Sequence, residues 1–224
     1  MVATVQRIVE ISWKRSYGNC VQAPHGVIFL KNFVLGKLLI IVLIVGQARD
    51  YGINFFRLRG VLDQEWVFID GSYIRVHQHA SGARHGFERA IGQSRGGRTT
   101  KIHLATDANG LPIDFKITGG GVHDSQVAKQ LIDTVGEATY LIADKGYDAE
   151  HIRIYAQNKD MIPIIPLRSN KVFDKYLYKL RHLVENVFAR LKHFRAIATR
   201  FDKLARNYQS MIYIACMFIW CKAK

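Results

Sequence analysis

Short apolar segments of strand length alternate with helical stretches from residue 66 onward, and this alternation restricts the chain to a few folds. Residues 66–77 form an apolar run that changes into alternation, which predicts a strand that becomes partly exposed. Residues 99–106 alternate again, a turn signal follows at 107–110, and residues 113–118 have the pattern of another strand. The last two strands therefore predict an antiparallel hairpin.

Two further strands and four helices complete the pattern. Residues 140–144 and 161–165 are short, wholly apolar runs, as expected for buried strands. Helical periodicity extends from about 124 to 135, from about 148 to 158, from 175 to 193 and from 203 to 222. This order predicts an α/β fold of ribonuclease-H-like type: a mixed sheet of about five strands flanked by helices, with a long C-terminal helix.

A glycine- and arginine-rich segment separates the first strand from the hairpin. Residues 79–99 contain five glycines and four arginines. A loop of about 20 residues is longer than most structural connections, so we expect a functional or mobile segment here.

Two aspartates follow apolar strand segments directly. Asp70 comes after Val-Phe-Ile and Asp144 after Leu-Ile-Ala, and each has a glycine one or two positions later. Binding sites in sheets of this kind gather beside the carboxyl ends of strands. Capping or turn aspartates are the alternative for each residue taken alone; the shared context favours a site.

Glu185 is the only acid between Lys175 and Phe201, in a segment rich in cations. At about 100° per residue, four side chains fall within roughly 60° on one helix face: Tyr178, Arg181, Glu185 and Lys192. A simple i, i+4 ion pair between Arg181 and Glu185 is the alternative, but it leaves the aligned tyrosine and lysine unexplained.

The chain carries a net charge of +14, which predicts attraction to a polyanion. Residues 166–224 hold 13 Lys and Arg against 3 Asp and Glu, whereas residues 66–165 hold 11 of each. The basic excess is therefore a C-terminal feature, which suits a nucleic-acid-binding face better than a uniform solubility coat.

Membrane and secretory locations are not favoured. The apolar run at residues 38–45 is only 8 residues long, well short of the ~20 that a membrane span needs. Three cysteines without metal-ligand spacing argue against a disulfide framework, and no signal peptide is evident. We expect a cytoplasmic protein with no membrane partner. His123 and Asp124 are interpreted as a pair that is either structural or supports neighbouring metal ligands, with Asp124 or Ser125 as the N-cap of the following helix.

Three carboxylates among cations suit phosphodiester chemistry. Carboxylate oxygens hold Mg²⁺ or Mn²⁺, and two such ions stabilise the attacking and leaving oxygens of an in-line displacement. Surrounding Lys and Arg side chains neutralise substrate phosphates. We therefore interpret Asp70, Asp144 and Glu185 as a metal-binding catalytic set with two ions.

Five motifs in this chain order resemble the DDE transposases of bacterial insertion sequences, especially the insertion sequence five family. They are Asp70-Gly-Ser-Tyr, Ser94-Arg-Gly-Gly-Arg-Thr-Thr-Lys-Ile-His103, Gly121-Val-His-Asp-Ser125, Ala143-Asp-Lys-Gly-Tyr-Asp148, and the spaced set Tyr178, Arg181, Glu185 and Lys192. The last set is the tyrosine–arginine–glutamate–lysine signature of that family.

The resemblance implies a ribonuclease-H-like catalytic core that cleaves DNA at transposon ends and transfers the freed 3′ end to target DNA. It places Asp70, Asp144 and Glu185 in the metal-binding catalytic positions. The signature residues Tyr178, Arg181 and Lys192 would contact DNA near the cut. From charge and position, we add four further expected phosphate contacts: Arg95, Arg98, Lys101 and Lys145.

The expected domain division is a poorly defined N-terminal region at residues 1–60 and a catalytic domain at 61–224. The N-terminal region has no recognisable helix-turn-helix pattern, and a degraded helical DNA-binding segment is one interpretation of it. A catalytically inactive remnant that only binds DNA is therefore the alternative function. The expected partners are double-stranded DNA, as terminal inverted repeats and target, and a second copy of the chain in a homodimer on DNA.

Overall fold

The structure of the 224-residue protein is a computed structural model that describes residues 21–22, 28–29, 65–81, 89–166 and 175–222. The chain divides into two compact units, Met1–Ile41 and Val42–Lys224. In the first unit, β1 (Val21–Gln22) and β2 (Ile28–Phe29) pair antiparallel. The apolar run at 38–45 and the proposed boundary after residue 60 lie outside the described residues, so the domain division stays a prediction.

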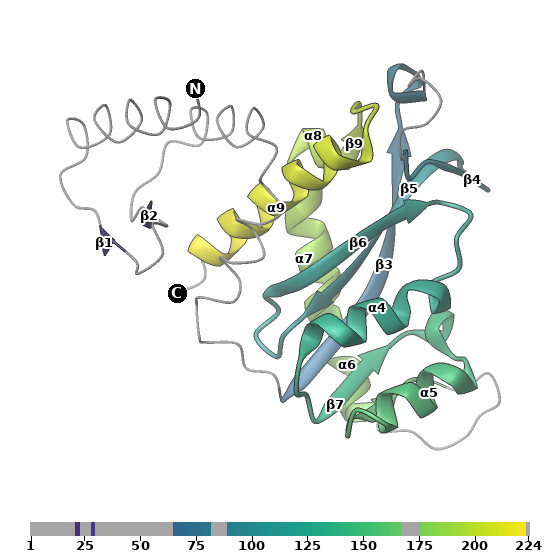
Figure 1. The fold of residues 1–224 in the computed structure, drawn as a ribbon, viewed down its shortest axis with the longest axis vertical. Coiled ribbons are helices and arrows are strands. Elements are labelled where there is room, and N and C mark those ends of the chain that lie inside the picture. Colours follow the sequence, from purple (N-terminus) through teal and green to yellow (C-terminus); the bar gives the residue numbers. More distant parts are fainter. Residues whose placement is uncertain (1–20, 23–27, 30–64, 82–88, 167–174, 223–224) are drawn as a thin grey trace. The chain divides into compact units, whose positions relative to one another are not determined.

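A single mixed sheet forms the centre of the second unit (Figure 1). Its principal strands are β3 (Trp66–Val76), β5 (Gly97–Thr106), β6 (Pro112–Gly119), β7 (Tyr140–Ala143) and β8 (Ile162–Ile164). They lie side by side in the order β6-β5-β3-β7-β8, with β5 antiparallel to β6 and β3, and with β7 and β8 parallel to β3. This is the strand order of a ribonuclease-H-like sheet, which confirms the predicted fold class.

Two short strands raise the number in the described part of this sheet to seven, against the expected five. β4 (Gly92–Ser94) pairs antiparallel with the start of β5, and β9 (Thr199–Arg200) pairs parallel with the end of β3. The prediction of one long loop at 79–99 is therefore wrong for its last third. The turn between β4 and β5 depends on Gly97, whose φ of +91° is accessible to glycine but disfavoured for other residues.

Helices cover both faces of the sheet (Figure 1). α4 (Ser125–Val135) and α5 (Glu150–Gln157) lie on one face, and α7 (His182–Lys192) and α9 (Ala205–Lys222) lie on the other. Because side chains alternate along a strand, Val67 and Ile69 of β3 enter the core under α4, together with Leu131. The intervening positions of β3 face α7, and this alternation decides which face each polar residue of β3 occupies.

The helix expected at residues 175–193 is interrupted. α6 (Lys175–Lys179) ends and α7 begins on either side of Leu180 and Arg181. Backbone hydrogen bonds there span three residues, from Arg181 N–H to the Tyr178 carbonyl oxygen (3.1 Å) and from Val184 N–H to the Arg181 carbonyl oxygen (3.2 Å). This tighter winding places Arg181 at the very start of α7.

The C-terminal helix is part of the core. Tyr208, Tyr213 and Trp220 are buried, and the Trp220 indole N–H donates to the Pro112 carbonyl oxygen at 2.7 Å. Within the described ranges, no helix has the length and apolarity required to cross a bilayer. α8 (Arg195–Ala198) connects α7 to β9.

Candidate active site

Asp70 and Asp144 lie on neighbouring parallel strands. The pairing of β3 with β7 brings Ile69 opposite Ala143, so the two aspartates are the next residues along each chain. Adjacent strands are about 4.8 Å apart, which places the two carboxyl groups side by side. Asp144 follows the end of β7 as expected, but Asp70 lies inside β3, which continues beyond the parallel pairing to Val76.

The backbone orients one oxygen of each carboxylate. The Gly71 amide donates to Asp70 Oδ1 at 2.8 Å, and the Gly146 amide donates to Asp144 Oδ1 at 2.7 Å. Each aspartate is thus held by a glycine one or two residues further along the chain. The Oδ2 oxygens are left to interact with other groups.

Arg181 joins Asp70 to Glu185 across the face of the sheet that α7 covers. Its guanidinium donates to Asp70 Oδ2 at 3.0 Å and, through its other terminal nitrogen, to Glu185 Oε1. The Asp70 side chain is only 14% exposed, whereas that of Glu185 is 50% exposed. The i, i+4 ion pair weighed from sequence is therefore present, but it is one half of a bridge between two carboxylates.

A pocket of about 330 Å³ opens over these groups. Its walls come from β3 and α7, and its lining residues are Asp70, Gly71, Ser72, Glu185, Phe188, Ala189 and Lys192. Lys192 therefore shares a pocket with two of the three predicted carboxylates. The Tyr178 ring lies 5.8 Å from the Arg181 guanidinium.

Burial and crowding of like charges make Asp70 reluctant to ionise. Burial raises its pKa from 3.8 to about 6, and the negative charges of Asp144 and Glu185 act in the same direction. The Gly71 amide and the Arg181 cation oppose this increase without cancelling it. The three carboxylates are thus close enough for Asp144 and Glu185 to affect the pKa of Asp70.

This donor set fits a divalent cation. Carboxylate oxygens are the ligands that Mg²⁺ and Mn²⁺ prefer, and a dication between neighbouring carboxylates relieves their mutual repulsion. In the part of the chain that the structure describes, no three His, Cys, Asp or Glu side chains converge tightly enough to enclose an ion. The Arg181 cation lies between Asp70 and Glu185, so movement of its side chain is required before both can bind the same ion.

Three of the four expected phosphate contacts are exposed, and they lie in two places. Lys145 is exposed and directly follows Asp144, beside the carboxylates. Arg95 and Arg98 are exposed on the hairpin of β4 and β5, about 20 Å from Asp70 at a rise of about 3.3 Å per residue along β5.

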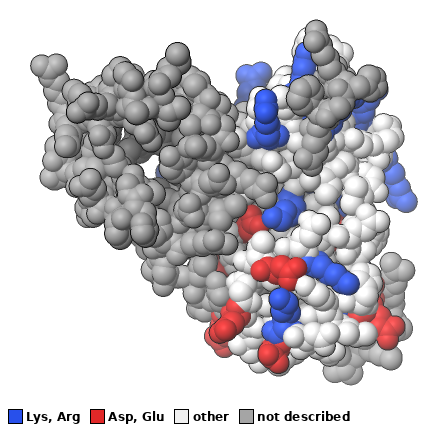
Figure 2. Space-filling view, viewed as in Figure 1, with Lys and Arg blue, Asp and Glu red and all other residues white. Residues whose placement is uncertain are grey.

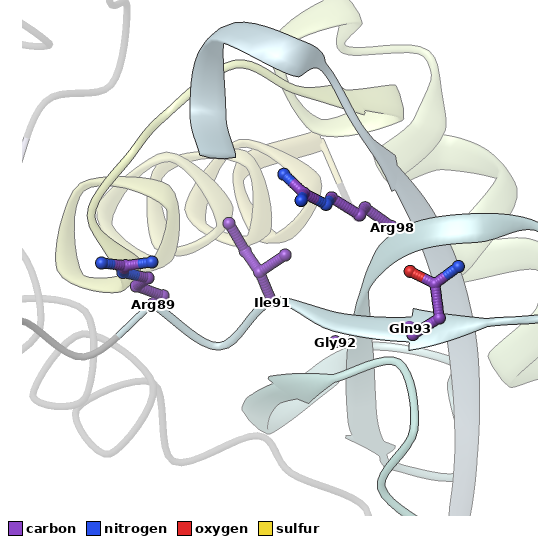
Figure 3. A pocket seen from close by; sticks show the side chains of 5 residues that line it. All are labelled: Arg89, Ile91, Gly92, Gln93 and Arg98. Atoms are coloured by element: carbon purple, nitrogen blue, oxygen red, sulfur yellow. The ribbon is translucent and has the colours of Figure 1, made fainter. Parts of the chain in front are cut away.

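The hairpin contributes to a basic pocket. This second pocket, of about 250 Å³, is lined by Arg89, Ile91, Gly92, Gln93 and Arg98 (Figure 3). On the face shown in Figure 2, acidic side chains gather mainly in the lower part, where α4 and α5 lie, and basic side chains predominate above them. The β4–β5 end of the domain thus provides positive charge away from the carboxylates.

The expectation for Lys101 disagrees with the structure. Lys101 is 3% exposed, and its Nζ atom lies 2.6 Å from Asp124 Oδ2 and 3.3 Å from the Tyr73 hydroxyl. A buried, ion-paired ammonium group does not reach a DNA phosphate. The alternation of β5 points Lys101 toward the α4 face instead of toward solvent.

Asp124 also departs from its predicted role. It occupies the residue before α4, but its side chain makes no capping hydrogen bond. His123 pairs with the Ser125 hydroxyl at 2.8 Å, so the predicted His123–Asp124 pair is not formed. Instead, Asp124 Oδ1 lies 3.1 Å from Nδ1 of His103, a residue that sequence reasoning did not single out.

The family comparison identifies related proteins along most of the described domain. Residues 62–220 match the family described as "Transposase DDE domain". A Brucella ovis protein named as a transposase for insertion sequence element IS6501 is 36% identical over 129 residues, covering 55% of this chain and 99% of that protein. A Burkholderia cepacia protein similarly named for element IS402 is 31% identical over 131 residues, covering 54% of this chain and 62% of that protein.

Solved structures give weaker similarities. The catalytic core domain of BIV integrase is 12% identical, with a TM-score of 0.36 over 66% of this chain and 82% of that chain. The catalytic domain of Mos1 mariner transposase is 9% identical, with a TM-score of 0.32 over 87% of this chain and 97% of that chain. Similarities of this strength do not bear on the chemistry of the site.

Proposed function

Because the chain belongs to the transposase DDE domain family, we propose that Asp70, Asp144 and Glu185 are the carboxylates with which it cuts and joins DNA. The chain is a DNA transposase, an enzyme that acts as a nuclease and as a strand transferase. The observation that supports the residue assignment is the arrangement of the three acids: Arg181 donates to both Asp70 and Glu185, and Asp144 lies beside Asp70 on the neighbouring strand.

The chemistry requires a cofactor that carboxylates can hold. Two Mg²⁺ or Mn²⁺ ions, when bound, supply Lewis-acid stabilisation of the attacking and leaving oxygens at phosphorus. Asp70 and Asp144 provide ligands from adjacent strands, and Glu185 provides them from α7. Oδ1 of each aspartate is preoriented by a backbone amide, which limits the freedom that ion binding must remove.

The cations around the site hold the substrate in register. Lys192 lines the same pocket as Asp70 and Glu185, and Lys145 is exposed next to Asp144. Tyr178 lies against Arg181, at the junction of α6 and α7. In our proposal, both side chains contact the DNA strand that enters the pocket. Arg95 and Arg98 would contact phosphates further along the duplex. Such contacts position DNA without specifying its sequence.

A homodimer on DNA completes the proposal. The described residues contain one such set of three carboxylates, whereas the two ends of an element must both be cut. Two copies of the chain supply two sets. Size-exclusion chromatography with light scattering, on the protein with and without terminal-repeat DNA, should detect two chains per pair of ends.

Cleavage of terminal-repeat DNA tests the assignment. The purified protein with Mg²⁺ or Mn²⁺ should nick or join DNA that bears the inverted repeats of its element. Asp144→Asn should remove this activity while leaving salt-sensitive DNA binding intact, because the substitution keeps the shape of the side chain and the surrounding cations. Asp160→Asn, which alters an acid beyond α5, is the matched control. Salt-sensitive binding by the unaltered chain with no cleavage would instead support a DNA-binding remnant.

A further inference from the structure

A charged cluster lies behind the two aspartates, on the face of the sheet that α4 covers. Lys101 and His103 are two residues apart on β5, so both side chains point to this face. Asp124 at the start of α4 receives both: Lys101 Nζ lies 2.6 Å from Oδ2, and His103 Nδ1 lies 3.1 Å from Oδ1. His103 is held in turn by its Nε2 atom, 2.8 Å from the Thr118 hydroxyl.

Almost none of this cluster is exposed. Lys101 and His103 are 4% and 0% exposed in their side chains, and that of Asp124 is 16% exposed. Removing charged groups from water costs free energy, and the attraction within an ion pair offsets that cost only when the geometry is good. A charged cluster buried in this way therefore points to a role other than stability. The usual role of an aspartate before a helix, capping of its amides, is absent here.

The Asp124 carboxylate packs against the backbone that carries both catalytic aspartates. A Cβ atom on Gly71 would lie 2.6 Å from Asp124 Oδ1, and one on Gly146 would lie 3.1 Å from Asp124 Oδ2. Only the absence of a side chain at these two positions allows so close an approach. The glycines that follow Asp70 and Asp144 therefore have a shared structural reason.

The same two glycines orient the aspartates through their amides. The Gly71 N–H binds Asp70 Oδ1, and the Gly146 N–H binds Asp144 Oδ1. A carboxylate fixed against both glycines restricts the positions of both amides. It thereby restricts the separation and the orientation of the two carboxyl groups in front of it.

We propose that Asp124 is a positioning residue of the active site, which braces the two glycines that follow the catalytic aspartates. Lys101 and His103 hold the brace in place from β5. Lys101 donates to Oδ2 of Asp124, and His103 Nδ1 lies 3.1 Å from Oδ1, so the role that we propose is one of support. The proposal rests on the proposed function only in taking Asp70 and Asp144 as the metal-binding pair.

Tyr147 lies in the same buried environment behind the site. It is 1% exposed, and its hydroxyl has no hydrogen-bond partner among the described residues. Burial raises the pKa of Tyr147, and the charges of Asp124, Asp70 and Asp144 raise it further. The Tyr147 hydroxyl is thus close enough to Asp124, Asp70 and Asp144 for all three charges to affect its pKa.

Two variants perturb the brace in different ways. Asp124→Asn removes the charge that Lys101 and His103 hold while keeping the size of the side chain. Gly71→Ala keeps every charge but places a methyl group in contact with Asp124 Oδ1. Asp133→Asn is the matched control, because Asp133 is an acid of the same helix whose side chain is 49% exposed.

The first measurement needs neither metal nor DNA. Amide hydrogen exchange of Gly71 and Gly146, followed by NMR in the metal-free protein, should be faster in both variants and unchanged in the control. The second is Mn²⁺ binding, followed by the electron paramagnetic resonance of free Mn²⁺. Both variants should raise the dissociation constant by about tenfold or more, as supporting residues around metal sites do. The protein that combines both substitutions should have a dissociation constant little higher than that of the more strongly affected single variant.

The outcomes separate this inference from the proposed function. Unchanged exchange at both glycines in both variants would overturn the brace, whatever the activity. Faster exchange at the glycines in a chain that binds no Mn²⁺ would support the brace and reject the metal-dependent function. An equal increase of the exchange rates and of the Mn²⁺ dissociation constant in the Asp133→Asn control would also overturn the inference. The effect would then not depend on contact with the glycines.

Discussion

Neutralising Asp70 should make the metal-free protein more stable while removing its activity. In the folded protein, burial and neighbouring negative charge raise the pKa of Asp70 from 3.8 to about 6. A carboxyl group with a raised pKa destabilises the folded state wherever it must ionise. Each pKa unit corresponds to about 1.4 kcal/mol, so the cost of ionising Asp70 on folding is about 3 kcal/mol at neutral pH.

The pH dependence has a definite sign. Below pH 3.8 the group is protonated in both the folded and the unfolded states, and it contributes nothing. As the pH rises from 3.8 to about 6, the unfolded chain ionises first, and the folded state loses stability relative to it. Asp70→Asn escapes this loss, so its stability advantage should be about 3 kcal/mol at pH 7.5 and about half of that at pH 5.

Urea unfolding of the two proteins without metal, at pH 5 and pH 7.5, measures this difference. Asp133→Asn is the control, because Tyr155 and Lys159 lower the pKa of Asp133 and its neutralisation should give no gain. Added Mn²⁺ should stabilise the unaltered protein by mass action and Asp70→Asn much less. An Asp70→Asn protein that is no more stable than the original at pH 7.5 would refute the reasoning.

Four further substitutions test other parts of the structure. Arg181→Lys should slow DNA cleavage by about tenfold or more in a single-turnover assay, because an ammonium group cannot reproduce the forked hydrogen bonds of a guanidinium to phosphate oxygens in the proposed DNA contact; an unchanged rate would contradict that role. Arg98→Gln should reduce the slope of log affinity against log salt by about one in DNA-binding titrations, whereas Lys101→Gln should leave the slope unchanged because its ammonium group is buried. Trp220→Phe should lower the free energy of unfolding by about 1–3 kcal/mol in urea, since it leaves the buried Pro112 carbonyl without its donor; a loss below about 0.5 kcal/mol would show that the bond is replaced.

The fold was largely accessible from local pattern. Apolar runs and alternation place the five principal strands along the chain, because both signals depend on neighbours within a few residues. The short strand β9 was missed, since its two residues pair with β3 more than 120 residues earlier and have no local signature. The interruption at Leu180 and Arg181 was missed for a related reason, because a three-residue winding keeps the apolar periodicity almost intact.

The site divides in the same way. The sequence indicated Asp70, Asp144 and Glu185 through their strand and helix context and through motifs that resemble a known family, since each aspartate taken alone also fits a turn or a cap. Which cations face DNA was not decidable from charge, because every Lys and Arg has the same formal charge in a sequence.

Only the tertiary structure assigned Lys101 to the interior and Asp124 to the glycines. Asp124 meets Lys101 and His103 across 23 and 21 residues of chain, by the packing of the start of α4 against β5. Burial and partner choice are properties of that packing, in which the strand face and the helix position must both be known. The residues proposed as catalytic were therefore indicated by the sequence, whereas the contacts of the residue proposed to hold them in place emerged only from the folded sheet.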